Sequence, residues 1–105
     1  MIIIETSLFT KQVQKLLSDE EYRQLQSELT IRPEMGAIIP KSGGLRKVRW
    51  RYRGKGKRGG VRVIYYWAVS PEQVLMLLLY PKNVQDNLSP AQLKTLKRIV
   101  EEEYL

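Results

Sequence analysis

The stretch from Lys41 to Arg62 has the sequence KSGGLRKVRWRYRGKGKRGGVR, which contains ten cationic residues and no acidic residue. The whole chain has 18 Lys and Arg residues and 11 Asp and Glu residues, so the eight cations and 11 acids elsewhere give a net charge of −3. The formal charge of +7 is therefore concentrated in this segment, which we call the basic stretch. Such a density of cations favours a surface that binds a polyanion over a loop that is merely solvated.

Two alternating segments surround the glycines of the basic stretch. Basic and apolar side chains alternate from Leu45 to Tyr52, and alternation returns from Val61 to Val69, where β-branched and aromatic residues are frequent. Alternation with period two is typical of a β-strand. The cations between the two segments are interrupted by glycines, as in a turn. The pattern predicts a β-hairpin with a long cationic tip.

The segment after this hairpin predicts one more strand and a helix. Gln73–Tyr80 is apolar at nearly every position, which is typical of a central strand that is buried on both faces. Pro81 ends this strand, and Lys82 and Asn83 follow directly. Ser89-Pro90 predicts the start of a C-terminal helix, with Ser as the cap and Pro at the first helical position.

The N-terminal part predicts a short strand and two helices. Ile2–Glu5 is an apolar, β-branched run, and Thr6 or Ser7 can cap a helix that begins near Leu8. Ser18–Glu21 has the sequence of a capping box, which starts a second helix. We therefore predict an α+β fold in the order β-α-α-β-β-β-α, in which a small antiparallel sheet is covered by the first two helices.

Length and composition exclude several classes of protein. A chain of 105 residues corresponds to one domain, residues 1–105. It has no cysteine and no histidine, which excludes disulfides, thiolate catalysis and cysteine-bound zinc, and removes the commonest metal ligand. We expect no metal ion and no cofactor. The first residues do not resemble a secretory signal, and the apolar run Val74–Tyr80 is too short to span a bilayer, so we expect a cytoplasmic protein.

Cations, tyrosines and backbone groups remain as candidate catalysts, and such a set can cleave RNA. The 2′-hydroxyl of RNA is an internal nucleophile, so the protein must align it, stabilise charge on the phosphate and transfer two protons. Arg62 opens one predicted strand and Lys82 follows the end of the next. Because neighbouring antiparallel strands run in opposite directions, we expect these two residues at the same end of the sheet. A dense cluster with Lys47 and Arg49 could lower the pKa of a lysine.

The aromatic residues and remaining cations extend this candidate surface. Trp50 and Tyr52 lie among the cations and could stack on bases. Tyr65, Tyr66 and Trp67 are expected in the core. The predicted RNA contacts are Arg46, Arg51, Arg53, Lys55, Lys57, Arg58, Tyr80 and Asn83.

At these residues the chain resembles the RelE/HigB superfamily of toxins from bacterial type II toxin–antitoxin modules, and the HigB-like branch most closely. The resemblance is carried by SDEEYRQLQSEL (Ser18–Leu29), GGLRKVR (Gly43–Arg49), GKGKRGGVRVIYYW (Gly54–Trp67) and LYPKN (Leu79–Asn83). It implies a small fold with an antiparallel sheet and a ribosome-dependent endoribonuclease that cuts mRNA in the ribosomal A site.

The resemblance also implies roles for single residues. Arg62 matches an arginine that contacts the scissile phosphate, and Lys82 matches a basic residue that stabilises the leaving group or the phosphate. Lys47 and Arg49 match paired cations that face the RNA, one of which could be the base. Some members have a catalytic tyrosine in the last helical region, where this chain has only Tyr104.

The implied partner is a cognate antitoxin, with a helix-turn-helix domain as in HigA, that neutralises the toxin and binds operator DNA. Two alternatives remain open from the residues. A non-catalytic module that binds RNA or the ribosome needs only the basic stretch, and its binding would depend steeply on salt. A gyrase-targeting toxin of the ParE branch would not need RNA-cleaving cations on the sheet.

Overall fold

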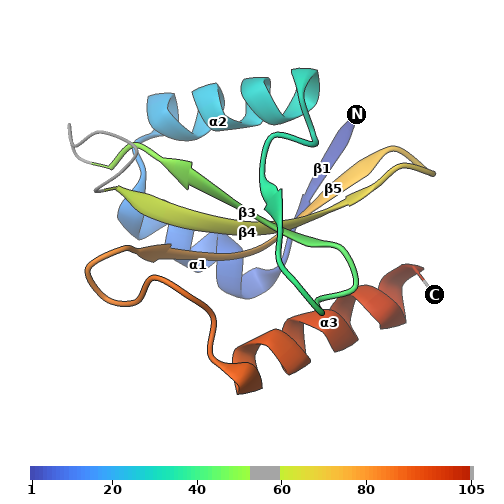
Figure 1. Cartoon of the computed structure of the whole chain (residues 1–105). Coiled ribbons are helices and arrows are strands. Elements are labelled where there is room, and N and C mark those ends of the chain that lie inside the picture. The colour runs from blue at the N-terminus through green and yellow to red at the C-terminus, as the bar shows by residue number, and fades with distance from the viewer. Residues whose placement is uncertain (53–59, 105) are drawn as a thin grey trace.

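The computed structural model describes residues 1–52 and 60–104, which form five strands and three helices (Figure 1). In chain order these are β1 (Ile2–Glu5), α1 (Ser7–Leu16), α2 (Asp19–Ile31), β2 (Ala37–Ile38), β3 (Leu45–Trp50), β4 (Val61–Ala68), β5 (Gln73–Pro81) and α3 (Pro90–Tyr104). The predicted α+β class and order of elements are confirmed, with the short strand β2 added. Four predicted RNA contacts lie outside the described residues: Arg53, Lys55, Lys57 and Arg58.

The five strands of the described chain form one mixed sheet in the order β1-β5-β4-β3-β2. β3, β4 and β5 make the antiparallel meander that the sequence predicts, and β2 pairs antiparallel with β3. β1 pairs parallel with β5, so the sheet is not purely antiparallel as predicted. Parallel neighbours need a long connection, and the chain between β1 and β5 provides one because it contains α1, α2 and the strands β2 to β4.

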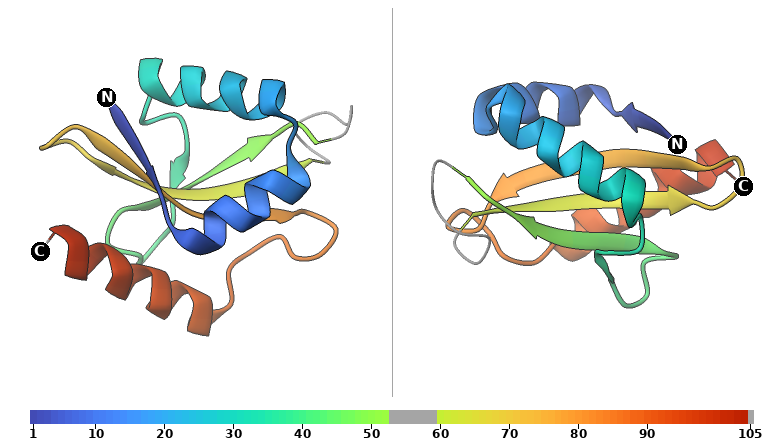
Figure 2. Two further views of the ribbon diagram at one scale, coloured as in Figure 1. Left: turned by 180° about the vertical axis from the view of Figure 1, so that it is seen from behind. Right: turned by 90° about the horizontal axis from the view of Figure 1, so that it is seen from above.

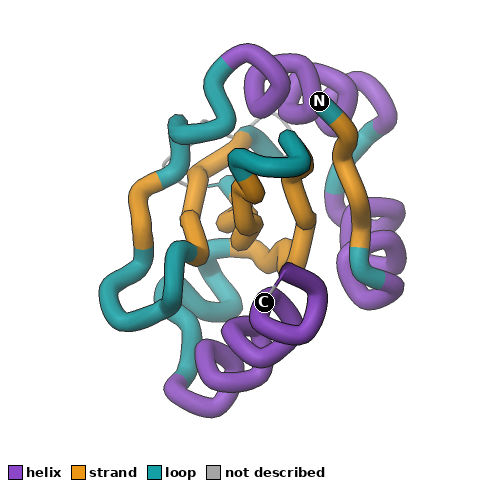
Figure 3. Tube along the Cα trace, turned by 90° about the vertical axis from the view of Figure 1, so that its right-hand side faces the viewer, coloured by secondary structure: helices purple, strands orange, loops and turns teal. Residues whose placement is uncertain are grey.

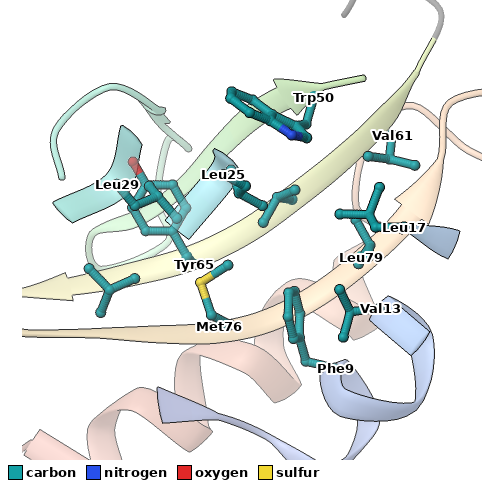
Figure 4. Packing of buried hydrophobic residues seen from close by; sticks show 12 residues of the cluster. Phe9, Val13, Leu17, Leu25, Leu29, Trp50, Val61, Tyr65, Met76 and Leu79 are labelled. Carbon is teal, nitrogen blue, oxygen red and sulfur yellow. The ribbon is translucent and has the colours of Figure 1, made fainter. Parts of the chain in front are cut away.

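α1 and α2 cover one face of the sheet (Figures 1 and 3). Phe9 from α1 and Leu25 and Leu29 from α2 are fully buried against strand residues that include Tyr65 and Met76 (Figure 4). The helix spacing of these apolar residues brings them onto one side of each helix. This face is therefore closed by the main apolar core.

α3 packs on the opposite face. Its residues Leu96 and Val100 are buried against Leu45, Ile64 and other strand residues. Figure 2 shows that α3 ends at the end of the sheet where β4 turns into β5, and there the Tyr104 hydroxyl donates to Oε1 of Gln73 at 3.0 Å. No helix within residues 1–52 and 60–104 is long and apolar enough to cross a membrane.

α2 and α3 both begin at reciprocal capping boxes. At α2, the backbone N–H of Glu21 donates to Ser18 Oγ at 3.0 Å, and the backbone N–H of Ser18 donates to Glu21 Oε1 at 2.9 Å. At α3, the backbone N–H of Gln92 donates to Ser89 Oγ at 3.1 Å, and the backbone N–H of Ser89 donates to Gln92 Oε1 at 2.9 Å. Each box satisfies two backbone groups that a helix start leaves free. The second box also fixes the end of the segment that joins β5 to α3.

β5 contains a bulge near its centre. The register shifts between Ile64 and Tyr65 of β4, which leaves Leu77 of β5 as an extra residue. Leu77 and Leu78 consequently both pack on the α3 side. Alternation resumes one position out of phase, so Tyr80 also faces the α3 side. Without the bulge, Tyr80 would face α1 and α2.

Candidate functional site

A row of three side chains crosses the middle strands on the face that carries α3. Arg49 of β3 lies opposite Arg62 of β4, and Arg62 lies opposite Tyr80 of β5. Lys47 precedes Arg49 by two residues and therefore lies on the same face. Arg62 thus has two cations beside it on β3 and a phenol beside it on β5.

The ends of β4 and β5 bring Lys82 to the same end of the sheet. The backbone N–H of Lys82 donates to the carbonyl oxygen of Gly60 at 3.0 Å, and Arg62 follows Gly60 by two residues. Both Lys82 and the adjacent Asn83 are exposed. The backbones of Arg62 and Lys82 therefore meet as the sequence predicts for neighbouring antiparallel strands.

The segment 82–89, which joins β5 to α3, folds over this row. Nζ of Lys47 donates to Oδ1 of Asn87 at 2.8 Å and to the backbone oxygen of Asp86 at 3.5 Å. The Tyr80 hydroxyl donates to the same backbone oxygen at 3.1 Å. Nε of Arg62 donates to the Asp86 carboxylate at 3.1 Å. Asp86 thus contacts side chains from all three central strands.

Arg62 is buried although it carries a charge. Only 1% of its side chain is exposed, and its Nη1 lies 3.4 Å from the backbone oxygen of Val61. A buried guanidinium is stable only where anionic or carbonyl oxygens surround it. Arg49, the neighbouring cation on β3, is exposed. The row therefore presents one deep cation and one shallow cation side by side.

The Tyr80 hydroxyl is a hydrogen-bond donor in this site. Burial raises the pKa of Tyr80 above its ordinary value of 10.0, the charge of Asp86 raises it further, and the charge of Arg62 opposes both. The hydroxyl consequently stays protonated at neutral pH, where it donates to Asp86. Tyr80 could donate to a phosphate oxygen but is not suited to act as a general base.

Arg46, a predicted RNA contact, lies on the opposite face of the sheet. Its Nη1 donates to the backbone oxygens of Glu34 at 3.0 Å and Gly36 at 2.8 Å, and its guanidinium lies 5.9 Å from the centre of the Trp67 ring. Successive side chains of a strand point to opposite faces, which separates Arg46 from Lys47. The structure therefore does not bring Arg46 together with the row.

Trp50 differs from the predicted surface, whereas Arg51 is exposed. Trp50 is 2% exposed and its Nε1 donates to the backbone oxygen of Glu21 at 3.1 Å, so the expectation that it stacks on bases is wrong. Its apolar ring closes the core beneath α2 instead. The guanidinium of Arg51 lies 5.6 Å from the Trp50 ring centre and lines a cleft of about 360 Å³ against α2.

Asp86 and Asn87, which the structure places at the centre of the site, belong to no motif of the sequence. The only sequence signal is position, because Asp86 is the acid nearest to Lys82 along the chain. Among the described residues, no three or more Asp and Glu side chains gather as a metal site would require. The described site combines cations, a protonated phenol and one carboxylate, a set that can bind and polarise a phosphate group.

Comparison with known proteins identifies relatives of this fold. Residues 1–104 match the family model described as the RelE toxin of the RelE/RelB toxin–antitoxin system. A free-state mutant of the E. coli toxin RelE is similar with a TM-score of 0.62 and 16% identity, over 93% of this chain and 96% of that chain. The isolated E. coli RelE toxin gives a TM-score of 0.61 and 17% identity, over 93% and 97%. At these identities the two structures support the fold, and the family match does not single out the HigB-like branch.

Proposed function

The chain belongs to the RelE toxin family of RelE/RelB toxin–antitoxin systems, and we propose that it is an endoribonuclease that cleaves mRNA in the ribosomal A site. The observation that carries this proposal is the row of Arg49, Arg62 and Tyr80 across three strands, with Lys47 and Lys82 at its two sides. Cations and a phenol suffice for such a reaction because RNA carries its own nucleophile.

The proposed reaction is a transesterification, in which the phosphorus exchanges its bond to the 5′-oxygen for a bond to the 2′-oxygen. The 2′-hydroxyl loses its proton to a base while a bond forms between the 2′-oxygen and the adjacent phosphorus. The bond from phosphorus to the 5′-oxygen breaks, and that oxygen takes up a proton. The products are a 2′,3′-cyclic phosphate and a 5′-hydroxyl. No metal ion is needed where guanidinium and ammonium groups neutralise the phosphate.

The arrangement of strands supports a division of roles. Arg62, in the middle of the row, would bind the non-bridging oxygens of the scissile phosphate. Lys47 and Arg49 lie on its β3 side and would include the base, whereas Lys82 lies at the end of β5 and would stabilise the leaving oxygen. An in-line displacement needs its entering and leaving oxygens on opposite sides of phosphorus. The cations on both sides of Arg62 support such an arrangement.

The primary test is primer extension on mRNA from cells that briefly express the wild-type chain or Arg62→Gln. We expect new 5′ ends inside translated frames with the wild type. We expect them to disappear with Arg62→Gln, a loss of at least about a hundredfold, as for other removed charge-stabilising donors. An untranslated copy of the same transcript should stay intact if the ribosome is required.

A matched control separates loss of function from loss of charge or fold. Arg23→Gln removes the same charge from an exposed site on α2, where Arg23 pairs with Glu20 at 2.8 Å, and should leave cleavage unchanged. Circular dichroism would verify that both variants fold. Growth arrest with intact messages would refute the nuclease and would favour gyrase poisoning or ribosome blockade.

The family implies a cognate antitoxin. We propose that this partner covers the cationic face with an acidic or helical segment, carries a helix-turn-helix domain and alone contacts operator DNA. Charge supports this, because the chain carries +7 overall. Coexpression of the antitoxin should restore growth in the assay above. A ribosomal target would place the active toxin in the cytoplasm.

A further inference from the structure

The ion pair between Arg62 and Asp86 is unequal. The Arg62 side chain is 1% exposed, whereas 54% of the Asp86 side chain is exposed, and their Nε and Oδ1 atoms lie 3.1 Å apart. Arg62 belongs to the central strand β4 and is held on both sides by β3 and β5. Asp86 belongs to the connection between β5 and α3 (Figure 1, orange). One partner is fixed and buried, and the other stands at the surface on a connecting segment.

The two partners differ in the free-energy cost of breaking the ion pair, because they differ in solvation. A half-exposed carboxylate is still hydrated, so moving it fully into water costs little. A buried guanidinium that loses its anion pays a large desolvation penalty until another anion replaces it. The stable alternative to the Arg62–Asp86 pair is therefore Arg62 with a different oxyanion. A phosphate offers the same type of acceptor oxygen at a similar distance.

The same segment occupies two other groups of the site. The backbone oxygen of Asp86 accepts from Tyr80 at 3.1 Å and from Lys47 at 3.5 Å, and Oδ1 of Asn87 accepts from Lys47 at 2.8 Å. These acceptors are neutral, so among the described contacts that the segment 82–89 makes with Lys47, Arg62 and Tyr80, the Asp86 carboxylate is the anionic one. Withdrawal of the segment would remove the contacts of Asp86 with Arg62 and Tyr80 together with the contacts of Asp86 and Asn87 with Lys47.

We propose that Asp86 is an internal competitor of the RNA phosphate. In the free protein its carboxylate fills the phosphate position at Arg62 and the segment 82–89 closes the site. RNA enters by exchanging one anion for another. The inference rests on the proposed function for the identity of the polyanion as RNA. Asp86 would then inhibit the site, in contrast to the residues that act on the substrate.

The opposite role for Asp86 is a permanent positioning partner that orients Arg62. The two roles predict opposite signs. Loss of a competitor strengthens RNA binding, whereas loss of a positioning partner weakens it. A third possibility is that any added positive charge strengthens binding to a polyanion. The test therefore needs a variant that changes the charge equally at a remote place.

The experiment measures binding of a short 2′-O-methyl RNA oligonucleotide, which cannot be cleaved because its 2′-oxygens are blocked. The variants are Asp86→Asn, which keeps the size of the side chain, and Asp86→Ala. Glu72→Gln is the matched control, because it removes the same charge as Asp86→Asn. Glu72 lies in the turn between β4 and β5, at the end of these strands that is distant from Arg62. Fluorescence anisotropy gives the Kd of each variant, and circular dichroism verifies folding.

We expect Asp86→Asn to lower the Kd by on the order of tenfold, since a hydrogen bond to a charged group contributes about that much. Glu72→Gln should change the Kd by less than about threefold, as is usual for one exposed charge. The gain should vanish in the double variant Asp86→Asn with Arg62→Gln, because no guanidinium remains to be released.

An equal or weaker affinity of folded Asp86→Asn would overturn the inference and would favour a positioning role. An equal gain with Glu72→Gln would also overturn it, because the effect would then be general. Failure of the proposed function looks different. A wild type that binds the oligonucleotide but leaves translated mRNA intact would remove the nuclease, while the gain at Asp86 would still stand as a property of RNA binding.

Discussion

Tyr65 joins the connection after α2 to the centre of the sheet. Its ring is fully buried, and its hydroxyl donates to the backbone oxygen of Pro33 at 2.7 Å and accepts from the backbone N–H of Gly36 at 2.8 Å. A Cβ atom at Gly36 would lie 2.8 Å from the Tyr65 ring and hydroxyl, so no larger residue fits there without movement. One hydroxyl thus satisfies a backbone oxygen and a backbone N–H of this connection.

Replacement of Tyr65 by Phe should therefore lower the free energy of unfolding by about 2–3 kcal/mol. The change removes two hydrogen bonds and leaves a buried donor and a buried acceptor unpaired. Urea denaturation monitored by circular dichroism measures the loss. Tyr66→Phe is the control at the next position, where the ring packs against Tyr104, and should stay within about 0.5 kcal/mol. Equal losses in both variants would contradict the assigned role of the Tyr65 hydroxyl.

At the scale of elements, the capping box at the start of α2 makes a local contribution to stability, and the sequence predicts it. Ser18→Ala should cost about 1 kcal/mol of stability, because it leaves the backbone N–H of Glu21 without its acceptor at 3.0 Å. Ser27→Ala is the same substitution inside α2 at an exposed position, and should be neutral or slightly stabilising because Ala has the higher helix propensity. Thermal unfolding measures both variants, and an equal loss of stability in Ser18→Ala and Ser27→Ala would argue against the capping contribution.

The elements also show what sequence could predict. Helix starts, the hairpin strands and the meeting of Arg62 with Lys82 depend on local residue types and on neighbouring strands, so the pattern was sufficient. The parallel pairing of β1 was missed because it joins segments about 70 residues apart. The bulge at Leu77 was hidden because an apolar run without alternation gives no sign of its phase.

The candidate site was predicted only in part, because local patterns place residues on strands but do not show which segments fold over them. Alternation puts Lys47 and Arg49 on one face with Arg62, whereas Arg46, which the basic stretch groups with them, lies on the opposite face. Asp86 could not be identified because its contacts depend on how the segment 82–89 folds back over β3 and β4. Patterns of charge report composition along the chain, whereas the fold decides which charges meet.

At the scale of the whole molecule, tyrosines link the core to pH. Burial is the largest cause that raises the pKa of Tyr22, Tyr65, Tyr80 and Tyr104 above 10.0. At Tyr22 a hydrogen bond donated to the Glu5 carboxylate adds to this effect. The folded state therefore holds these four protons more tightly than the unfolded chain does.

Stability should consequently be lost at alkaline pH. A group whose folded pKa is raised contributes stability fully below its unfolded pKa, which is about 10 for tyrosine. The free energy of unfolding should fall as the pH rises above about 10, by up to about 1.4 kcal/mol per pH unit for each tyrosine. Urea denaturation between about pH 8 and pH 11 measures the slope. Tyr22→Phe should reduce the slope, and a stability that does not decrease over this range would contradict the prediction.

The extra residue in β5 makes the site depend on parity. Tyr80 shares a face with Arg62 because Leu77 adds one position to the strand. An insertion or deletion of one residue between Leu77 and Tyr80 would exchange odd and even positions and turn Tyr80 towards α1 and α2. Changes of two residues would restore the order. A redesign of β5 can therefore exchange its apolar side chains, but it has to change the number of residues before Tyr80 in steps of two.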